Sequence, residues 1–338
     1  MHITNSFVRN TEIQGTEETR EIKMDYLMIL IPKLLRFLIL IAIGFVVSKL
    51  GVIKKEGLPT LSGLLINVAM PLLIISIMNQ QATSVMDLLE FRRMVGWQLF
   101  GYFLLALTGV LVSKLLRLDH RSGNVHRGSM VGGNYAFIVL PLIMTLFTPE
   151  DGQQYIPVCS AVDTLTAWTL ALSFFSQGVD NGGRSKLAII GKKFINPIMV
   201  AIVGMLILNS LSVRLPEPFL AVSDELGNAS LCLGLIYVGA VICYMEKGNL
   251  TTIKNSSILT ISKLIVVPFV VYLVTSRFMH ETESIILMLI AGSPTFTVSC
   301  VLAEQYHLDL EYAATNVFLT TTGCLLSIPL LFVLITFV

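Results

Sequence analysis

The sequence predicts an all-α integral membrane protein with ten transmembrane helices. Of its 338 residues, 54% are hydrophobic and only 13% are charged, whereas a soluble domain carries about 25% charged residues. Ten apolar stretches each approach the roughly 20 residues that a helix needs to cross a bilayer. Two of these stretches are interrupted by helix breakers at corresponding places in the two halves of the chain, a pattern typical of transporters.

The apolar stretches define ten expected spans. The segments between them carry nearly all of the charged residues. Residues 1–23 are polar and mixed in charge, and we interpret them as an N-terminal tail rather than a cleavable signal peptide, because no apolar core follows a basic start. Met24 is an alternative start of the natural product. The spans lie near residues 30–50, 59–79, 95–115, 128–148, 154–177, 196–214, 219–244, 257–278, 284–304 and 313–337.

The distribution of Lys and Arg predicts the orientation of these spans. Counting the residues at the span ends, thirteen of them lie at or after the ends of spans 1, 3, 5, 7 and 9, against four at or after the ends of spans 2, 4, 6 and 8. Cytoplasmic loops carry the excess of Lys and Arg. We therefore expect both termini on the non-cytoplasmic side of the cell (inner or plasma) membrane.

A polar linker, residues 179–195, which we expect in the cytoplasm, divides the chain into two five-span repeats, residues 24–178 and 196–338. An odd number of spans in each half gives the two halves opposite orientations. Asn67 in span 2 and Asn228 in span 7 occupy matching places. The sequence therefore predicts a 5+5 inverted repeat, an architecture that suits alternating access.

Spans 4 and 9, the fourth span of each half, carry the interruptions. Residues 132–134 read Gly-Gly-Asn and precede Pro141, and residues 292–295 read Gly-Ser-Pro-Thr. The start of a half-helix offers free N–H groups and partial positive charge, which suit an anion. The alternative is that the prolines only kink two packed helices. We assign substrate binding to Gly133, Asn134, Pro141, Gly292, Ser293, Pro294 and Thr295.

One carboxylate lies deep in an expected span. Asp163 is roughly 13 Å below the outer end of span 5 at 1.5 Å per residue, and a charge at such a depth costs a few kcal/mol. It could carry a proton, bind a cation, or serve as a structural counter-ion bonded to Thr164 or Thr166. Asn316 lies in span 10, the counterpart of span 5. Asp163 and Asn316 are the candidates for proton or ion coupling.

Lys263 lies one or two turns inside span 8. It could attract an anionic substrate. We favour the alternative in which its long side chain reaches back to the membrane surface and keeps the ammonium in water.

The remaining residues indicate no cofactor, metal or nucleic acid. The five Cys are odd in number and form no CxxC pair, and the five His lie outside the expected spans. No HExxH, P-loop, GxSxG or dinucleotide-binding pattern occurs. The net charge of +1 gives no sign of nucleic-acid binding. We therefore expect a protein that is not an enzyme.

The chain resembles the bacterial branch of the auxin efflux carrier family over residues 24–338. The resemblance rests on residues 67–71 (Asn-Val-Ala-Met-Pro), on the Asn134, Phe137 and Pro141 pattern, on residues 293–295 and 301–306, and on a Thr-rich tenth span. Two residues depart from the family's pattern: Val139 stands where bacterial members often have Gly, and Cys232 replaces a common proline.

The resemblance implies a scaffold of spans 1, 2, 6 and 7 that also forms a homodimer, and a moving transport domain of spans 3–5 and 8–10. It implies that spans 4 and 9 cross at their prolines, with the substrate beside the crossing. Bacterial members of the family are usually described as permeases for organic anions such as malate or malonate.

We expect a secondary transporter that moves a small organic anion, a carboxylate, by an elevator-like motion. The main alternative is a sodium-coupled carrier of the bile-acid-symporter type, which would need cation ligands near the crossing. An intramembrane enzyme would need paired Asp motifs, a Ser/His pair or metal ligands inside the spans. A non-transporting membrane sensor is a further alternative, and such a protein usually carries an attached soluble signalling domain. The sequence does not identify the substrate, the direction of flux or the coupling ion.

Overall fold

The chain folds into helices in the computed structural model, which describes residues 32, 35–81, 84–177, 197–245 and 250–337. Within these ranges the β pairing is limited to one isolated bridge, between Gly133 and Thr295. The expected tail, residues 1–23, and the expected linker, residues 179–195, lie outside the described residues.

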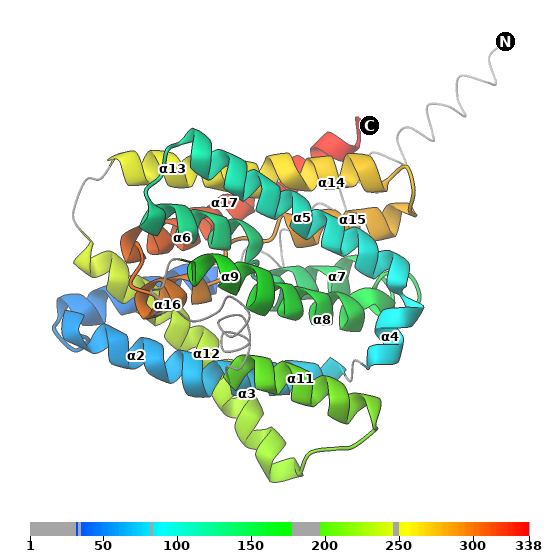
Figure 1. The fold of residues 1–338 in the computed structure, drawn as a ribbon, viewed down its shortest axis with the longest axis horizontal. Coiled ribbons are helices and arrows are strands. Elements are labelled where there is room, and N and C mark those ends of the chain that lie inside the picture. Colours follow the sequence, from blue (N-terminus) through cyan, green and yellow to red (C-terminus); the bar gives the residue numbers. More distant parts are fainter. Residues whose placement is uncertain (1–31, 33–34, 82–83, 178–196, 246–249, 338) are drawn as a thin grey trace, which may run out of the picture.

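Helical segments follow one another along the whole described chain (Figure 1). The first is the helix at residues 35–49. The others up to the linker are η1 (Lys55–Gly57), α2 (Leu58–Leu64), η2 (Leu65–Ala69), α3 (Met70–Gln81), α4 (Val85–Glu90), α5 (Arg92–Leu115), α6 (His120–Val131), η3 (Tyr135–Val139), α7 (Leu140–Leu146), η4 (Gln153–Tyr155), α8 (Ile156–Thr166), η5 (Ala167–Ala171) and α9 (Leu172–Phe175). After the linker come α11 (Pro197–Ser210), α12 (Glu217–Tyr244), α13 (Leu250–Ile261), η6 (Ser262–Val266), α14 (Val267–Thr275), α15 (Glu281–Ala291), α16 (Val298–Gln305) and α17 (Leu310–Ile335).

Six of the described helices are long and apolar enough to cross a membrane. The helix 35–49, the interrupted pairs α6/α7 and α15/α16, and the 14-residue α11 are individually shorter. The six are Lys55–Gln81, Arg92–Leu115, Gln153–Phe175, Glu217–Tyr244, Leu250–Thr275 and Leu310–Ile335.

Three prolines are each the second residue of an α-helix that follows a π-helical turn. Pro71, Pro141 and Pro268 follow η2, η3 and η6, and in each case the helix continues past the proline. A proline has no N–H and its ring clashes with the carbonyl four residues earlier. A wider π turn at that place relieves the clash, so the helix is locally distorted but not broken.

The helices form two groups. The first group consists of the helix 35–49, α2, α3, α11 and α12, where α3 packs against both α11 and α12. The second group contains α5–α9 and α13–α17, with α5 against α6, α14 against α15, and α13 and α16 against α17. Figure 1 shows the first group along one edge of the molecule and most of the second group opposite, with α7, α8, α9 and α16 between them.

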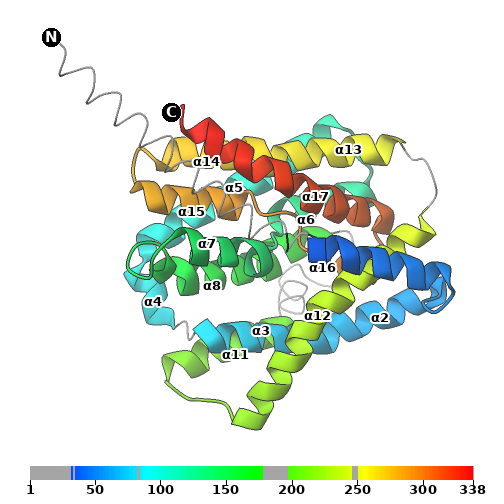
Figure 2. The same cartoon turned by 180° about the vertical axis from the view of Figure 1, so that it is seen from behind.

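Glycines let two helices of the first group approach closely. Figure 2 shows the helix 35–49 lying across α12. A Cβ on Gly44 would lie 2.0 Å from the Ile236 carbonyl oxygen, and one on Gly239 would lie 1.9 Å from the Ile41 carbonyl oxygen. Small residues at such crossings are the usual means of packing helices within a membrane.

The helix before the first interruption differs from the prediction. It begins at His120 rather than near residue 128, with Asp119 accepting hydrogen bonds from the N–H groups of Arg121 and Ser122 at its N-terminus. It therefore includes His126, which was predicted to lie outside the spans. His126 is fully buried, and its Nδ1 lies 2.7 Å from the Tyr312 hydroxyl. Hydropathy misses this part of the helix because its polar side chains have partners inside the protein.

Candidate functional site

The two interrupted helices meet at their interruptions. Gly133 and Thr295 form an antiparallel backbone bridge. The Asn134 N–H donates to the Pro294 carbonyl at 2.9 Å, and the Phe296 N–H donates to the Gly132 carbonyl at 3.3 Å. Backbone groups freed by a helix break at membrane depth must find partners within the protein. Here backbone groups freed in one interruption hydrogen-bond to backbone groups freed in the other.

The glycines at the crossing allow this approach. A Cβ on Gly132 would lie 2.0 Å from the Phe296 ring, and one on Gly133 would lie 3.0 Å from the Ser293 hydroxyl oxygen. A Cβ on Gly292, the residue after α15, would lie 3.1 Å from the Pro268 ring. Side chains at Gly132 and Gly133 would push the two interruptions apart, and one at Gly292 would press on Pro268 of α14.

Thr295 ties the crossing to the helices around it. Its N–H donates to the Thr320 hydroxyl oxygen at 3.0 Å, and its own hydroxyl donates to the Ser129 carbonyl at 3.1 Å. Thr295 is fully buried and Ser293 is 1% exposed. Thr295 therefore holds the backbone in place, and neither of these two predicted site residues lines the cavity described next.

A small cavity of about 90 Å³ lies beside the crossing, between the two groups of helices. Met70, Leu73, Ile74 and Ile77 of α3 form its apolar wall, with Ser230 and Leu231 of α12. The opposite wall comes from the second group of helices. It consists of Gly133, Asn134, Tyr135, Ala136, Asp163, Thr164, Ala167, Trp168, Phe296, Thr297 and Val298.

The starts of both second half-helices line this cavity. Asn134 precedes η3 and Thr297 precedes α16, and neither side chain caps its helix. The Asn134 side chain is 6% exposed, and its Nδ2 has no hydrogen-bond partner. Uncapped helix starts carry free N–H donors and partial positive charge. The cavity thus offers donors from two helix ends and one amide side chain.

Asp163 lines the same cavity, and its partner differs from those considered from the sequence. The Tyr102 hydroxyl of α5 donates to Asp163 Oδ1 at 2.5 Å. Thr164 is a neighbour along the cavity wall, while Thr166 is not among the lining residues. No local sequence pattern pointed to Tyr102, because its position in α5 relates to Asp163 only through the packing of α5 against α8.

Two other predicted site residues, Pro141 and Asn316, lie within helices. Pro141 is in the first turn of α7, beyond the π turn that starts at Tyr135, so the chain departs from the helix at residues 132–134 and not at this proline. Asn316 is fully buried in α17, and neither its Oδ1 nor its Nδ2 has a partner. Asn316 is not among the residues that line the cavity.

The prediction that Lys263 reaches the membrane surface is wrong. Lys263 is 1% exposed. Its ammonium donates to the carbonyls of Ser129, Met130 and Gly132 at 2.9, 2.7 and 3.0 Å. These three oxygens belong to the last turn of α6 and the residue that follows it. Lys263 therefore bonds the C-terminal end of the half-helix that leads into the crossing.

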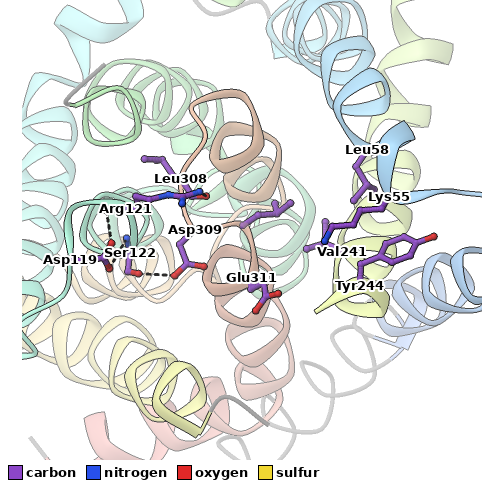
Figure 3. Close-up of a pocket in the computed structure, with 11 residues that line it drawn as sticks. Lys55, Leu58, Asp119, Arg121, Ser122, Val241, Tyr244, Leu308, Asp309 and Glu311 are labelled. Atoms are coloured by element: carbon purple, nitrogen blue, oxygen red, sulfur yellow. Dashed lines mark hydrogen bonds between the residues drawn. The ribbon is translucent and has the colours of Figure 1, made fainter. Parts of the chain in front are cut away.

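A larger cavity of about 440 Å³ lies between the same two groups of helices, at another place (Figure 3). Lys55, Leu58, Val241 and Tyr244 come from the first group, and Figure 3 shows them facing residues 119–122 and 308–311 of the second. Within the second wall, Arg121 donates to the Leu308 carbonyl at 3.0 Å and Ser122 donates to Asp309 at 2.6 Å.

Asp119 is the N-cap of α6 in this second wall. Its partial burial acts to raise the pKa of the carboxyl, but hydrogen bonds from the Ser122 hydroxyl and from the Arg121 and Ser122 amides outweigh burial and hold that pKa below its usual value. Asp119 is therefore ionised at neutral pH and stabilises the positive end of α6.

Residues 29–182 and 184–332 match the sequence profile of a family described as membrane transport proteins. The chain belongs to this family. The match confirms the resemblance to the auxin efflux carriers. An uncharacterized transporter from Methanocaldococcus jannaschii is 26% identical over 312 residues, which cover 90% of this chain and 98% of that protein. Together with the long apolar helices, the family makes this chain a multi-pass membrane transport protein.

Proposed function

We propose that this protein is a secondary transporter for a small organic anion, a carboxylate, held beside the crossing of the two interrupted helices. The observation that carries the proposal is the meeting of two uncapped half-helix starts on one cavity, next to the unpaired amide of Asn134. An anion leaves water for a site of low dielectric constant only if hydrogen-bond donors converge on it there and replace its hydration shell. We propose that the donors around this cavity do so.

The proposed membrane topology is ten spans in a 5+5 inverted repeat. The first half contributes the helix 35–49, α2/α3, α5, α6/α7 and α8/α9, and the second half contributes α11, α12, α13/α14, α15/α16 and α17. The fourth member of each half is the interrupted one. In the orientation that the Lys and Arg distribution predicts, the residues that line the cavity of Figure 3 lie at the cytoplasmic ends of the spans, and both termini lie on the non-cytoplasmic side of the plasma membrane.

The proposed mechanism is an elevator-like movement of the second group of helices along the first. Support comes from the position of the anion cavity, whose crossing-side wall belongs to the second group and whose apolar wall belongs to α3 and α12. A bound anion would travel with the crossing, while the apolar wall stays behind. The first group, which contains spans 1, 2, 6 and 7, would form a homodimer.

Asp163 is the proposed site of proton coupling, if transport is coupled. It is the carboxylate among the residues that line the cavity, and Tyr102 bonds it. The sodium-coupled alternative would use Asp163 with amide groups such as Asn316. Uptake into proteoliposomes in sodium and in choline buffers separates the two mechanisms, because only the alternative requires sodium.

The test of the anion site is a thermal-shift titration of the purified protein with mono- and dicarboxylates. A ligand that binds the folded state raises the unfolding midpoint with its concentration. Asn134→Ala removes one donor, so we expect the dissociation constant of the best carboxylate to rise roughly tenfold or more, as for a lost hydrogen bond to a charged group.

Asn67→Ala is the matched control, because Asn67 is exposed and its side chain donates to the Gly63 carbonyl within α2/η2. Equal binding by both variants would reject the site.

A further inference from the structure

The ammonium group of Lys263 is buried in the middle of an apolar helix. It lies in η6, between α13 and α14, in a continuous helix from Leu250 to Thr275. Three carbonyl oxygens lie 2.7–3.0 Å from its Nζ. An ammonium has three N–H donors, so all of them are used. Lys263 is not among the residues lining the cavity at the crossing.

The three oxygens form a cage with negative character. They come from Ser129, Met130 and Gly132, where α6 stops and the chain turns into the crossing. Carbonyls at the C-terminal end of a helix have no partner in the helix itself and carry its partial negative charge. Within a membrane such an end needs a cation or a donor, since water does not reach it.

The cage is connected directly to the crossing. The Ser129 carbonyl accepts from both Lys263 and the Thr295 hydroxyl, and the Gly132 carbonyl accepts from both Lys263 and the Phe296 N–H. Asp163, on the cavity wall, interacts electrostatically with the same ammonium. The ammonium therefore helps to fix the geometry of the donors that face the cavity, because it shares two carbonyl acceptors with Thr295 and Phe296 of the other interruption.

We propose that the ammonium of Lys263 is a tethered cation that occupies a monovalent-cation site at the C-terminal end of α6. In other membrane carriers, half-helix ends of this kind coordinate ions taken from solution. Here the chain supplies the cation itself, so the folded crossing needs no ion at this place. Shortening the side chain opens the cage to a free monovalent cation.

The direct test is a thermal-shift comparison of wild type, Lys263→Ala and Lys263→Met in choline, sodium, potassium, ammonium and propylammonium chlorides at constant ionic strength. We expect wild type to unfold at the same temperature in all five salts. Lys263→Ala should unfold at a lower temperature than wild type in choline. Its unfolding temperature should rise, and then level off, with the concentration of at least one of the other four cations. Lys263→Met should be less stable and show no such recovery, because its side chain fills the space without a charge.

Two results would overturn the proposal. One is a Lys263→Ala variant whose unfolding temperature does not depend on the cation, and the other is a wild-type protein that responds to the same cation. If Lys263→Ala yields no folded protein in choline, it is purified in ammonium and in propylammonium chloride. Recovery of folded protein in either salt supports the tethered cation. Failure in both salts rejects the tethered cation, and a Lys263→Gln variant as stable as wild type would reject it too, because a neutral donor would then suffice.

The consequence for transport rests on the proposed function. Wild-type flux of a carboxylate should be equal in sodium, potassium and choline, and flux by Lys263→Ala should depend on the cation that restores its stability. The ion-binding test needs no substrate. A negative flux result with a positive stability result would therefore reject the proposed transport role and leave the cation site standing.

Discussion

The crossing depends on single residues whose roles come from what they touch. Asn134, Gly133 and Asp163 were selected from the sequence, because polar or small residues within an apolar span indicate a site, and all three line the cavity. Tyr102 and Lys263 were not assigned to the crossing. Their partners lie on helices distant in the sequence, Asp163 on α8 and the end of α6, and no local pattern encodes those contacts.

Gly132→Ala tests the close approach of the two interruptions. The new methyl would lie 2.0 Å from the Phe296 ring, so the ring or the crossing must shift. Overpacking of this kind costs about 1–3 kcal/mol. We expect a lower unfolding temperature and weaker carboxylate binding. Gly96→Ala in α5 is the control, because a Cβ there meets no atom within 4 Å. If the two variants behave alike, the crossing is not as tightly packed as described.

At the scale of helices, hydropathy locates each apolar segment, and helices occupy all ten of the predicted ranges in the part of the chain that the structure describes. Hydropathy places boundaries less well where polar side chains are buried by partners, as for His126 in α6. It also does not distinguish a proline that distorts a helix from a break. Pro141 and Pro268 lie in continuing helices after π turns, whereas Pro294 lies within the interruption itself.

Gly239→Ala tests whether the helix 35–49 and α12 form a rigid unit. The added Cβ would lie 1.9 Å from the Ile41 carbonyl oxygen, a backbone atom that can move only with its helix. We expect the free energy of unfolding to fall by about 1–3 kcal/mol, seen as a lower unfolding temperature in detergent. Gly204→Ala in α11 is the matched control within the same group of helices, since a Cβ there meets nothing within 4 Å. An unchanged Gly239→Ala protein would contradict the close packing.

At the scale of the whole molecule, the two groups of helices meet at two cavities, one at the crossing and one shown in Figure 3. The sequence predicts the membrane class, and through the family resemblance a division into scaffold and moving domain. It does not predict the cavities, because each is lined by residues from helices far apart in the chain. Their position between the groups is the structural reason to expect relative movement.

Cross-linking across the cavity of Figure 3 tests that movement. Lys55 and Glu311 line opposite walls, one from each group of helices. With the five native cysteines replaced, Lys55→Cys/Glu311→Cys is joined by a bifunctional thiol reagent in proteoliposomes. If the second group must slide along the first, the cross-link should reduce carboxylate flux to background, and cleaving the linker should restore it.

The control places the same reagent within one group. Arg121→Cys/Leu308→Cys joins two residues of the second wall, whose native side chain and carbonyl lie 3.0 Å apart. A body that moves as a unit tolerates an internal link, so this variant should keep its flux after cross-linking. Equal loss in both variants would indicate damage by the reagent or movement within the second group. Full flux through the linked Lys55→Cys/Glu311→Cys protein would rule out sliding at this interface, because a covalent link holds the two walls at a fixed separation.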